Sequence, residues 1–443
     1  MPASAAPAPR VAGRPSLPCY AEALQLSPSG AMTLSWLAPN PRADRSRPYG
    51  PAQQRVVTSA GVSDLAAGMS RCPAHRITPL YALPGLAARL GVESISVKDE
   101  AQRFGFGAFK ALGGVNAVYR HLATLVADAQ HRTPDFEALM SGKARAVTGD
   151  IVFTTASSGN HGRSVAAGAR LFGYRCVIFL PAFASAEKEA AIRQRGAEII
   201  RIDGDYEAAV ARCREVAAAN SWVVVSDTSW DGYDRIPADV MQGYSVLAFE
   251  ALQQFRAATG AAAPTHVFVQ AGVGGLAAAV IGTLWQTLAA ARPAFVVVEP
   301  ASADCWFQSN KAGQPALASG DATTAMGGLA CREISPMTWP VVGDGTDWFM
   351  TIPEEAVAPA MRQLARPEPG DPVIVAGPSG CSGMAALLRV AAEPTARSAL
   401  SLDARSQVLL INSENANGEP ALFEQAAGMT AAEATAAMSH SPR

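Results

Sequence analysis

Short, unbroken apolar runs that alternate with alanine-rich stretches constrain the fold of this 443-residue chain more than any other feature. Several runs hold four or five apolar residues without polar alternation, as expected for strands that are covered on both faces. Strands that alternate with helices predict parallel α/β sheets joined by crossover connections. The expected strands are 94–100, 150–156, 176–181, 199–203, 222–227, 266–272, 295–300, 372–377 and 407–413. The expected helices are 161–172, 186–196, 205–219, 237–258, 276–291, 354–365 and 381–393.

Composition excludes several classes of protein. Hydrophobic residues make up 49% of the chain and charged residues 17%, which excludes a disordered chain. A formal net charge of −2 gives no sign of the basic face that nucleic acid or an anionic membrane would require, so we expect neither partner. The seven cysteines are never spaced C-x-x-C, so we expect no metal site and a reduced, cytoplasmic protein. The uncharged run 267–291 is interpreted as a strand, a glycine loop and a helix rather than a membrane span.

Two of the predicted strands lead into segments with chemically useful side chains. In parallel α/β sheets, binding and catalysis gather at the carboxyl ends of strands. Lys110 lies between Phe109 and a small-residue segment, so it either opens a helix at the surface or carries the partly neutral amine that Schiff-base chemistry requires. The turn after strand 150–156 either grips a carboxylate at a helix N-terminus or is an ordinary serine cap. This turn contains Ser157, Ser158, Gly159, Asn160 and His161.

A glycine loop follows strand 266–272, and its N–H groups could approach a phosphate. The loop consists of Gly272, Val273, Gly274 and Gly275. A dinucleotide site is the rival interpretation, matched only in part because Ala277 stands at the third glycine position. Glu299, at the end of the next predicted strand, keeps that rival open. Ser413 ends the last predicted strand, and a hydroxyl there means little alone.

The order of lysine, asparagine turn, glycine loop and terminal serine resembles the fold-type II pyridoxal-phosphate enzymes, which include the tryptophan synthase β-subunit and the serine and threonine dehydratases. The resemblance implies an α/β fold with two doubly wound, parallel-type sheets, pyridoxal 5'-phosphate as cofactor and a homodimer. It also implies a large domain of residues 51–114 and 226–443 and a small domain of residues 115–225. Residues 1–50 are expected to form a flexible leader or arm.

The same resemblance assigns roles to the motif residues. Lys110, next to Phe109, would bind the cofactor as a Schiff base, and Asn160 would lie near the cofactor hydroxyl. The glycine loop would bind the phosphate, and Ser413 would meet the pyridine nitrogen.

Within these enzymes the chain most resembles the diaminopropionate ammonia-lyases, from Pro79 to Ser413. Two of the supporting segments, 226–244 and 326–339, are long and are not shared by the dehydratases at large. The resemblance implies α,β-elimination on 2,3-diaminopropionate or a close β-substituted amino acid, giving a 2-oxo acid (pyruvate) and ammonia. The supporting segments are 98–114, 160–166, 226–244, 326–339 and 377–387.

One position departs from that family. The lyases carry an aspartate immediately before Gly-Asn-His-Gly, where it acts as an acid or base, and this chain has Ser158 there. The second acidic residue is kept as Asp227, so we expect Lys110, Asp227 and Ser158 to be catalytic. Ser157, Ser158 and His161 are expected to bind the substrate, and Asp231 is the poorer substitute for the missing carboxylate.

Ser158 leaves alternative functions open. A serine is natural in a dehydratase or racemase that acts on a β-hydroxy amino acid. A β-replacement synthase, a non-catalytic cofactor-binding protein and a dinucleotide-dependent oxidoreductase are further alternatives.

Overall fold

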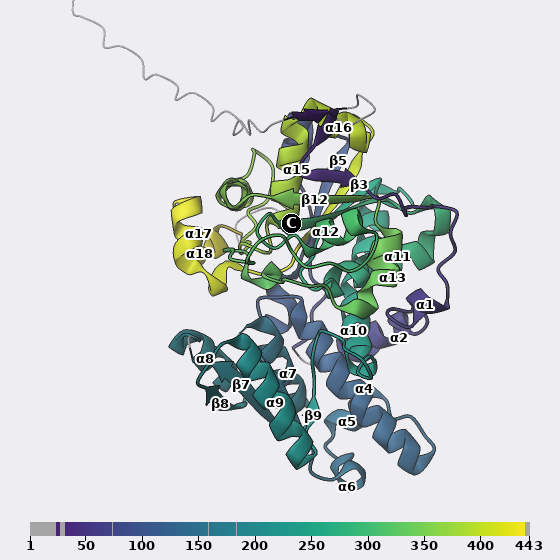
Figure 1. Cartoon of the computed structure of the whole chain (residues 1–443), viewed down its shortest axis with the longest axis vertical. Coiled ribbons are helices and arrows are strands. Elements are labelled where there is room, and N and C mark those ends of the chain that lie inside the picture. Colours follow the sequence, from purple (N-terminus) through teal and green to yellow (C-terminus); the bar gives the residue numbers. More distant parts are fainter. Residues whose placement is uncertain (1–23, 27–31, 73, 158, 183, 439–443) are drawn as a thin grey trace, which may run out of the picture.

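A seven-stranded sheet forms the upper part of the molecule in Figure 1. The computed structural model describes residues 24–26, 32–72, 74–157, 159–182 and 184–438. The five central strands are parallel, and an antiparallel strand lies at each edge. In order across the sheet, the strands are β3 (Leu37–Pro39), β12 (Trp348–Ile352), β11 (Ala294–Pro300), β10 (His266–Gln270), β13 (Gln407–Asn412), β5 (Ser94–Asp99) and β4 (Leu80–Ala82).

A second, four-stranded sheet lies in the lower part of Figure 1 and is parallel throughout. Its strands are, in order, β8 (Glu198–Ile202), β7 (Arg175–Pro181), β6 (Val152–Ala156) and β9 (Val223–Val224). β1 (Leu24–Leu26) and β2 (Met32–Leu34) form a separate antiparallel pair. The fold class predicted from the sequence is therefore confirmed, with a mixed seven-stranded sheet and a parallel four-stranded one.

Helices cover both sheets, and α4 packs against α10 and α7 near the junction of the two halves. α10 ends where Gly260 adopts a φ of 72°, a conformation that glycine takes without steric cost. The helices are α1 (Pro51–Gln54), α2 (Val62–Ser70), α3 (Pro84–Leu90), α4 (Lys110–Gln130), α5 (Phe136–Met140), α6 (Arg145–Thr148), α7 (Asn160–Leu171), α8 (Ala186–Arg193), α9 (Tyr206–Asn220), α10 (Arg235–Thr259), α11 (Gly275–Leu288), α12 (Cys305–Ala312), α13 (Trp339–Gly345), α14 (Val357–Ala365), α15 (Ser382–Ala392), α16 (Pro394–Leu400), α17 (Pro420–Ala427) and α18 (Ala431–Met438). Short 3₁₀ helices are η1 (Glu100–Gly105), η2 (Ala289–Ala291), η3 (Gly327–Leu329), η4 (Pro336–Thr338), η5 (Glu354–Ala356) and η6 (Ala416–Gly418).

The central strand β10 shows why the apolar runs lack alternation. Val267 and Val269 contribute to one hydrophobic cluster, whereas Phe268 contributes to a second one. Because successive side chains of a strand point to opposite faces, a strand between two cores carries apolar side chains on both faces. Among the described residues, no helix is long and apolar enough to cross a membrane.

Two expectations from the sequence are wrong. Segment 372–377 is not a strand, because Ile374 N–H donates to Leu364 O and Gly377 N–H to Glu414 O, each at 2.9 Å, instead of to a neighbouring strand. The flexible leader does not extend to residue 50, because β3 pairs with β12 and Asn40 Nδ2 donates to Gly343 O at 2.8 Å. Residues 1–23 and 27–31 lie outside the described part of the chain.

The expected domain boundary after residue 114 falls inside helix α4. The four-stranded sheet, from Val152 to Val224, lies within the expected small domain, 115–225. The division into a large and a small domain stays a prediction.

Candidate active site

Strand order brings the predicted functional segments together. β10, β13 and β5 are neighbours in the seven-stranded sheet, and their carboxyl ends lead to the glycine loop, to Ser413 and, through η1, to Lys110. β6 and β9 are neighbours in the other sheet and lead to the turn before α7 and to Asp227. All the predicted strand-end segments therefore come from two sets of adjacent strands.

Lys110, the first residue of α4, and Asp227 form an ion pair across the two halves. Lys110 Nζ lies 2.7 Å from Asp227 Oδ2, and the two side chains are 23% and 20% exposed. Burial works to lower the pKa of Lys110, but the Asp227 carboxylate outweighs it and the net shift is upward. Burial likewise opposes ionisation of Asp227, yet His161 and Lys110 hold its pKa below the ordinary value. The pair can hold a proton between an amine and a carboxylate.

His161 stands behind this pair. Its Nε2 donates to Val225 O at 2.8 Å, and its Nδ1 lies 3.8 Å from Asp227 Oδ2. The ring is buried, and burial lowers its pKa although Asp227 opposes the shift. This position favours a contact with Asp227, and the expected contact of His161 with a substrate stays a prediction.

Asn160 is held by two charged residues that the sequence analysis did not select. Its Nδ2 donates to Glu414 Oε2 at 3.0 Å, and Arg163 Nη1 donates to its Oδ1 at 3.1 Å. Burial raises the pKa of Glu414, against the effect of its hydrogen bonds from Ser379. Glu414 directly follows Ser413, so its position one residue beyond a predicted site residue was the available signal.

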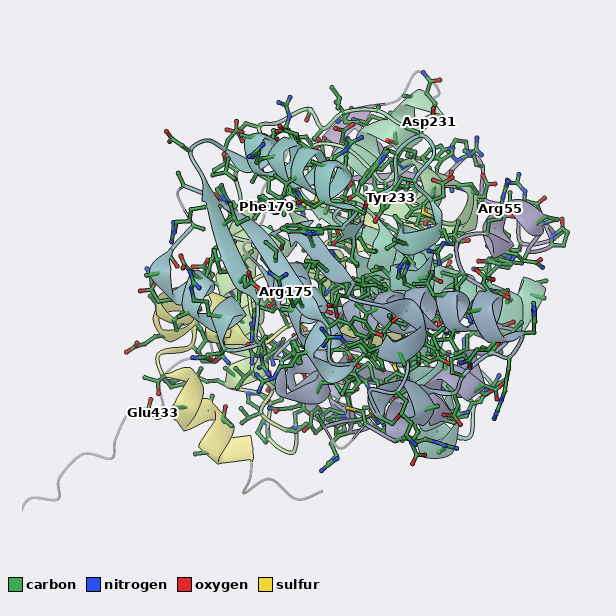
Figure 2. All side chains as sticks on the ribbon, turned by 90° about the horizontal axis from the view of Figure 1, so that it is seen from below. Arg55, Arg175, Phe179, Asp231, Tyr233 and Glu433 are labelled. Atoms are coloured by element: carbon green, nitrogen blue, oxygen red, sulfur yellow. The ribbon has the colours of Figure 1, made fainter. Side chains whose placement is uncertain are left out.

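Ser157 lies in the same turn and forms hydrogen bonds within it. Ser157 Oγ accepts from the N–H groups of Gly159 and Gly162, at 3.3 and 3.1 Å, so its oxygen is used to shape the turn. Ser158 lies outside the described residues. Asp231 is exposed and lies at the periphery of the molecule (Figure 2).

The glycine loop is shaped to bind an anion. Gly274 adopts a φ of 102° at the N-terminus of α11, and a Cβ there would lie 2.3 Å from Trp306 Cζ2. Among the described residues, the N–H groups of Gly274 and Gly275 donate to no acceptor. Free amides at the start of a helix attract negative charge, so the loop fits a phosphate group.

Glu299 is not available to a dinucleotide ribose. Its carboxylate is completely buried, and its two oxygens accept from the N–H groups of Trp306 and Phe307, each at 2.8 Å. Trp306 Nε1 in turn donates to Gly272 O at 2.9 Å. Glu299 therefore supports the glycine loop through Trp306, and its oxygens are not available to bind a ribose.

Gln270 on β10 lies beside the Ser413 hydroxyl. Gln270 Nε2 lies 2.9 Å from Ser413 Oγ and also contacts the carbonyls of Ser379 and Ile411. Nε2 has two hydrogens for these three oxygens and cannot accept a hydrogen bond, so the Ser413 hydroxyl hydrogen does not point to Gln270 and is left to donate elsewhere. A free hydroxyl hydrogen at this strand end fits an unprotonated pyridine nitrogen.

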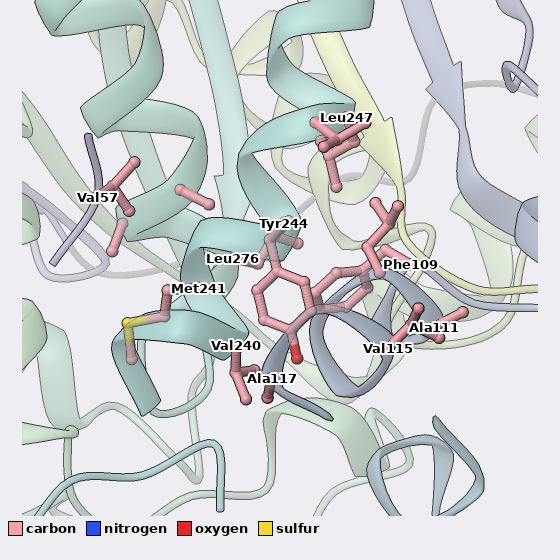
Figure 3. Packing of buried hydrophobic residues seen from close by; sticks show 14 of the residues in the cluster. Val57, Phe109, Ala111, Val115, Ala117, Val240, Met241, Tyr244, Leu247 and Leu276 are labelled. Atoms are coloured by element: carbon pink, nitrogen blue, oxygen red, sulfur yellow. The ribbon is translucent and has the colours of Figure 1, made fainter. Parts of the chain in front are cut away.

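Phe109 connects the lysine segment with the rest of the site. Its N–H donates to Ser413 O at 3.0 Å. Its ring meets that of Tyr244 on α10 edge to face, with the ring centroids 4.6 Å apart (Figure 3). The residues present thus offer a lysine amine, an anion-binding loop and a hydroxyl donor, and this set fits pyridoxal phosphate.

The fold and this set of groups define a lysine-dependent pyridoxal-phosphate enzyme of fold type II. Residues 72–414 match the family model described as pyridoxal-phosphate dependent enzyme, and the chain belongs to that family. This membership shows that the dinucleotide-dependent alternative is wrong.

Individual relatives narrow the comparison. The chain is 37% identical over 387 residues to diaminopropionate ammonia-lyase of Salmonella typhimurium, covering 86% of this chain and 95% of that protein. The crystal structure of diaminopropionate ammonia-lyase from Escherichia coli in complex with D-serine matches with a TM-score of 0.78 and 34% identity, over 88% of this chain and 96% of that chain. A probable D-serine dehydratase of Acidovorax is 31% identical over 257 residues, covering 56% of this chain and 55% of that protein.

Proposed function

We propose that this protein is an ammonia-lyase that acts on 2,3-diaminopropionate. The observation that carries the proposal is the similarity to the Salmonella lyase along nearly the whole of both chains. The ion pair of Lys110 and Asp227, at 2.7 Å, supplies the acid–base groups that such a reaction needs.

The overall reaction consumes one water. A proton leaves Cα, the Cβ–N bond breaks with its electron pair going to nitrogen, and ammonia departs after taking up a proton. The remaining unsaturated amino acid hydrolyses to pyruvate and a second ammonia. An amine leaves poorly unless it is protonated, so one group must remove the Cα proton and an acid must deliver one to nitrogen.

The chain's own residues divide this work. Lys110 would bind the cofactor covalently, and Ser413 would donate to its pyridine nitrogen. Asn160 would lie near the cofactor hydroxyl, and the phosphate would be held by Gly272, Val273, Gly274 and Gly275. Bound pyridoxal phosphate supplies the electron sink that makes the Cα proton acidic. Lys110 and Asp227 then move the protons, because both reach the same point between the two halves of the molecule.

Among the described residues, Asp227 is the carboxylate that pairs with Lys110. Because a second aspartate of the lyases is replaced in this chain, we infer that one enantiomer of the substrate reacts much faster than the other. Ser158 replaces the aspartate that the lyases place before Gly-Asn-His-Gly. The variant Ser158→Asp is expected to raise turnover of the slower enantiomer and to leave the faster one within about threefold. An equal effect on both enantiomers would contradict this assignment.

The test of the proposed function measures pyruvate and ammonia from L- and D-2,3-diaminopropionate and from L- and D-serine. Diaminopropionate should give two ammonia for each pyruvate, and the variant Lys110→Ala should give neither product. Pyruvate from a serine enantiomer, with no reaction of diaminopropionate, would instead identify a dehydratase. The replacement of the aspartate by Ser158 is the observation that favours this second candidate.

A homodimer and a cytoplasmic location are also proposed. The dimer rests on the fold-type II resemblance, and the location rests on scattered cysteines without C-x-x-C spacing. Sedimentation of the holoenzyme over a tenfold concentration range tests the dimer, and a single monomeric species throughout would contradict it.

A further inference from the structure

The segments 226–244 and 326–339 meet at two buried serines, Ser229 and Ser335. Ser229 N–H donates to Ser335 Oγ at 2.9 Å, and the two Oγ atoms lie 3.0 Å apart. Met337 N–H donates to Ser229 Oγ at 3.1 Å, which closes the contact from the other side. The two segments that distinguish this chain from the dehydratases thus form one hydrogen-bonded unit.

Ser335 also forms a hydrogen bond with the glycine loop. Its N–H donates to Val273 O at 2.9 Å, and Thr338 Oγ1 approaches the same carbonyl at 3.2 Å. Thr338 Oγ1 donates to Ser335 O at 2.6 Å as well. Through its backbone Ser335 therefore contacts the glycine loop, and through its side chain it contacts the segment that carries Asp227.

The upstream part of the Asp227 segment is held by local bonds. Tyr233 Oη donates to Val224 O at 2.7 Å and accepts from Ser226 N–H at 3.1 Å. Thr228 N–H donates to Ser226 Oγ at 3.1 Å. Among the described residues, the hydrogen bonds that tie this segment to the glycine-loop side run through Ser229, whereas Asp227 itself reaches Lys110.

We propose that Ser335 is a positioning residue that fixes the Asp227 carboxylate relative to the phosphate-binding loop. Ser335 thereby sets the distance between the glycine loop, through Val273, and the segment that carries Asp227, through Ser229. The effect on turnover rests on the proposed function, whereas the effect on the geometry around Lys110 does not.

The two contacts of Ser335 can be separated by substitution. Ser335→Ala keeps the backbone N–H that donates to Val273 and removes the oxygen that accepts from Ser229. The proposal therefore predicts unchanged cofactor affinity together with a lower kcat. A displacement of about 1 Å costs on the order of 10²-fold in rate, so we expect kcat to fall about 10- to 100-fold, with KM within about threefold.

The absorption band of the lysine-bound cofactor gives a readout independent of substrate. A carboxylate close to the Lys110 nitrogen stabilises a positive charge there, so moving Asp227 away should shift the pH midpoint of the band downward. The holoenzymes of the wild type and of Ser335→Ala are titrated under identical conditions, and Ser335→Thr, which keeps the hydroxyl, should return the midpoint toward the wild-type value.

Ser406→Ala is the matched control. Ser406 is equally buried, and its Oγ accepts from a backbone N–H, that of Asp403, at 2.8 Å. It lies just before β13, away from Asp227 and the glycine loop. Its removal costs the same kind of bond and should leave kcat and the absorption midpoint unchanged.

Three results would overturn the proposal. These are a loss of cofactor affinity that matches the loss of kcat, an absorption midpoint that does not move, and a kcat no lower than that of the control. Should Ser335→Ala not fold, Ser229→Ala is the second variant. It loses the acceptor for Met337 N–H and the contact with Ser335 Oγ but keeps the Ser229 N–H that donates to Ser335, so it is expected to give a smaller shift of the same sign. A wild type that makes no pyruvate from diaminopropionate refutes the proposed function, while the titration still tests Ser335.

Discussion

Two lysines that are close in the sequence, Lys98 and Lys110, each pair with a carboxylate at nearly the same distance. The two pairs differ in burial and in their other hydrogen bonds. Lys98 Nζ lies 2.8 Å from Glu250 Oε2, and Lys110 Nζ lies 2.7 Å from Asp227 Oδ2. The first pair is 0% and 6% exposed, and the second is 23% and 20% exposed. Distance alone does not distinguish a structural pair from a chemical one.

Hydrogen-bond capacity distinguishes the two lysines. Lys98 uses all of its donors, because Nζ also contacts Thr78 O and Gln254 Oε1 at 2.8 Å each. Among the described residues, Lys110 Nζ donates to Asp227 alone. Burial lowers the pKa of Lys98 more than its carboxylate neighbours raise it, whereas Asp227 raises the pKa of Lys110. Unused donors and access from outside favour Lys110 as the reactive lysine.

Removing the reactive amine gives the largest expected effect. Lys110→Ala should lower the rate of pyruvate formation by at least about 10⁴-fold, because it removes the amine proposed to bind the cofactor covalently. The absorption band of the bound cofactor should be lost, while thermal unfolding stays cooperative. Activity above about 1% of wild type would contradict the assignment.

Neutralising the partner of Lys110 should act on proton transfer and spare the covalent link. Asp227→Asn is expected to lower kcat by about 10²- to 10⁴-fold, the usual contribution of a positioned acid or base. The cofactor absorption should remain, with its pH midpoint displaced downward. Stopped-flow kinetics and a pH titration measure the two effects, and an unchanged kcat would exclude Asp227 from the reaction.

Removing the lysine of the buried Lys98–Glu250 pair should affect stability instead of turnover. Lys98→Met leaves Glu250 and its neighbours without one buried charge partner, which costs about 3–5 kcal/mol. Urea unfolding measures the loss, and kcat per folded molecule should be unchanged. Arg175→Met is the control (Figure 2). It breaks the pair of Arg175 with Glu198, which are 2.9 Å apart and each more than half exposed, and should cost less than about 1 kcal/mol.

The smallest expected effect concerns Asp99, which is completely buried next to Lys98. Burial raises its pKa to about 6 from an ordinary value of 3.8, although Ala101 and Asn412 oppose the shift. The folded state therefore keeps this proton to higher pH than the unfolded state, so stability falls as pH rises through this window and is constant above it. Asp99→Asn should remove this loss, worth up to about 3 kcal/mol.

Urea unfolding of wild type and Asp99→Asn at several pH values between 4 and 8 checks this prediction. The variant's advantage should grow with pH and level off above the pKa of Asp99. A difference that does not depend on pH would show that this carboxyl is ionised throughout.

The segments of the candidate site can be recognised in the sequence, but the residues that hold those segments in place cannot. Lys110, the glycine loop and Ser413 follow strands that could be recognised from apolar runs, and Asp227 was expected beside them. The contact of Asn160 with Glu414 joins residues 254 positions apart, and no local pattern points to it. Gln270 and Ser335 were missed for the same reason, because each acts through partners from other segments.

Errors in the fold have a related cause. Segment 372–377 has the composition of a strand, but Ile374 and Gly377 find their acceptors at the end of α14 and after β13. Strand β12 was not predicted, although Trp348–Ile352 is a short apolar run, and it provides the edge on which β3 pairs. Composition marks a segment as buried and extended, whereas only a neighbouring strand makes it part of a sheet.

The sequence by itself determined the α/β class, the order of the functional segments and the place of the glycine loop between a strand and a helix. These properties are local, since they depend on apolar periodicity and on the backbone freedom of single residues. The tertiary structure alone decided which strands are neighbours, and hence that Asp227 meets Lys110 while Glu250 meets Lys98. Which lysine pairs with which carboxylate depends on strand order and on packing between distant segments. The surroundings of each pair then decide whether it is buried and fully hydrogen-bonded or accessible with unused donors.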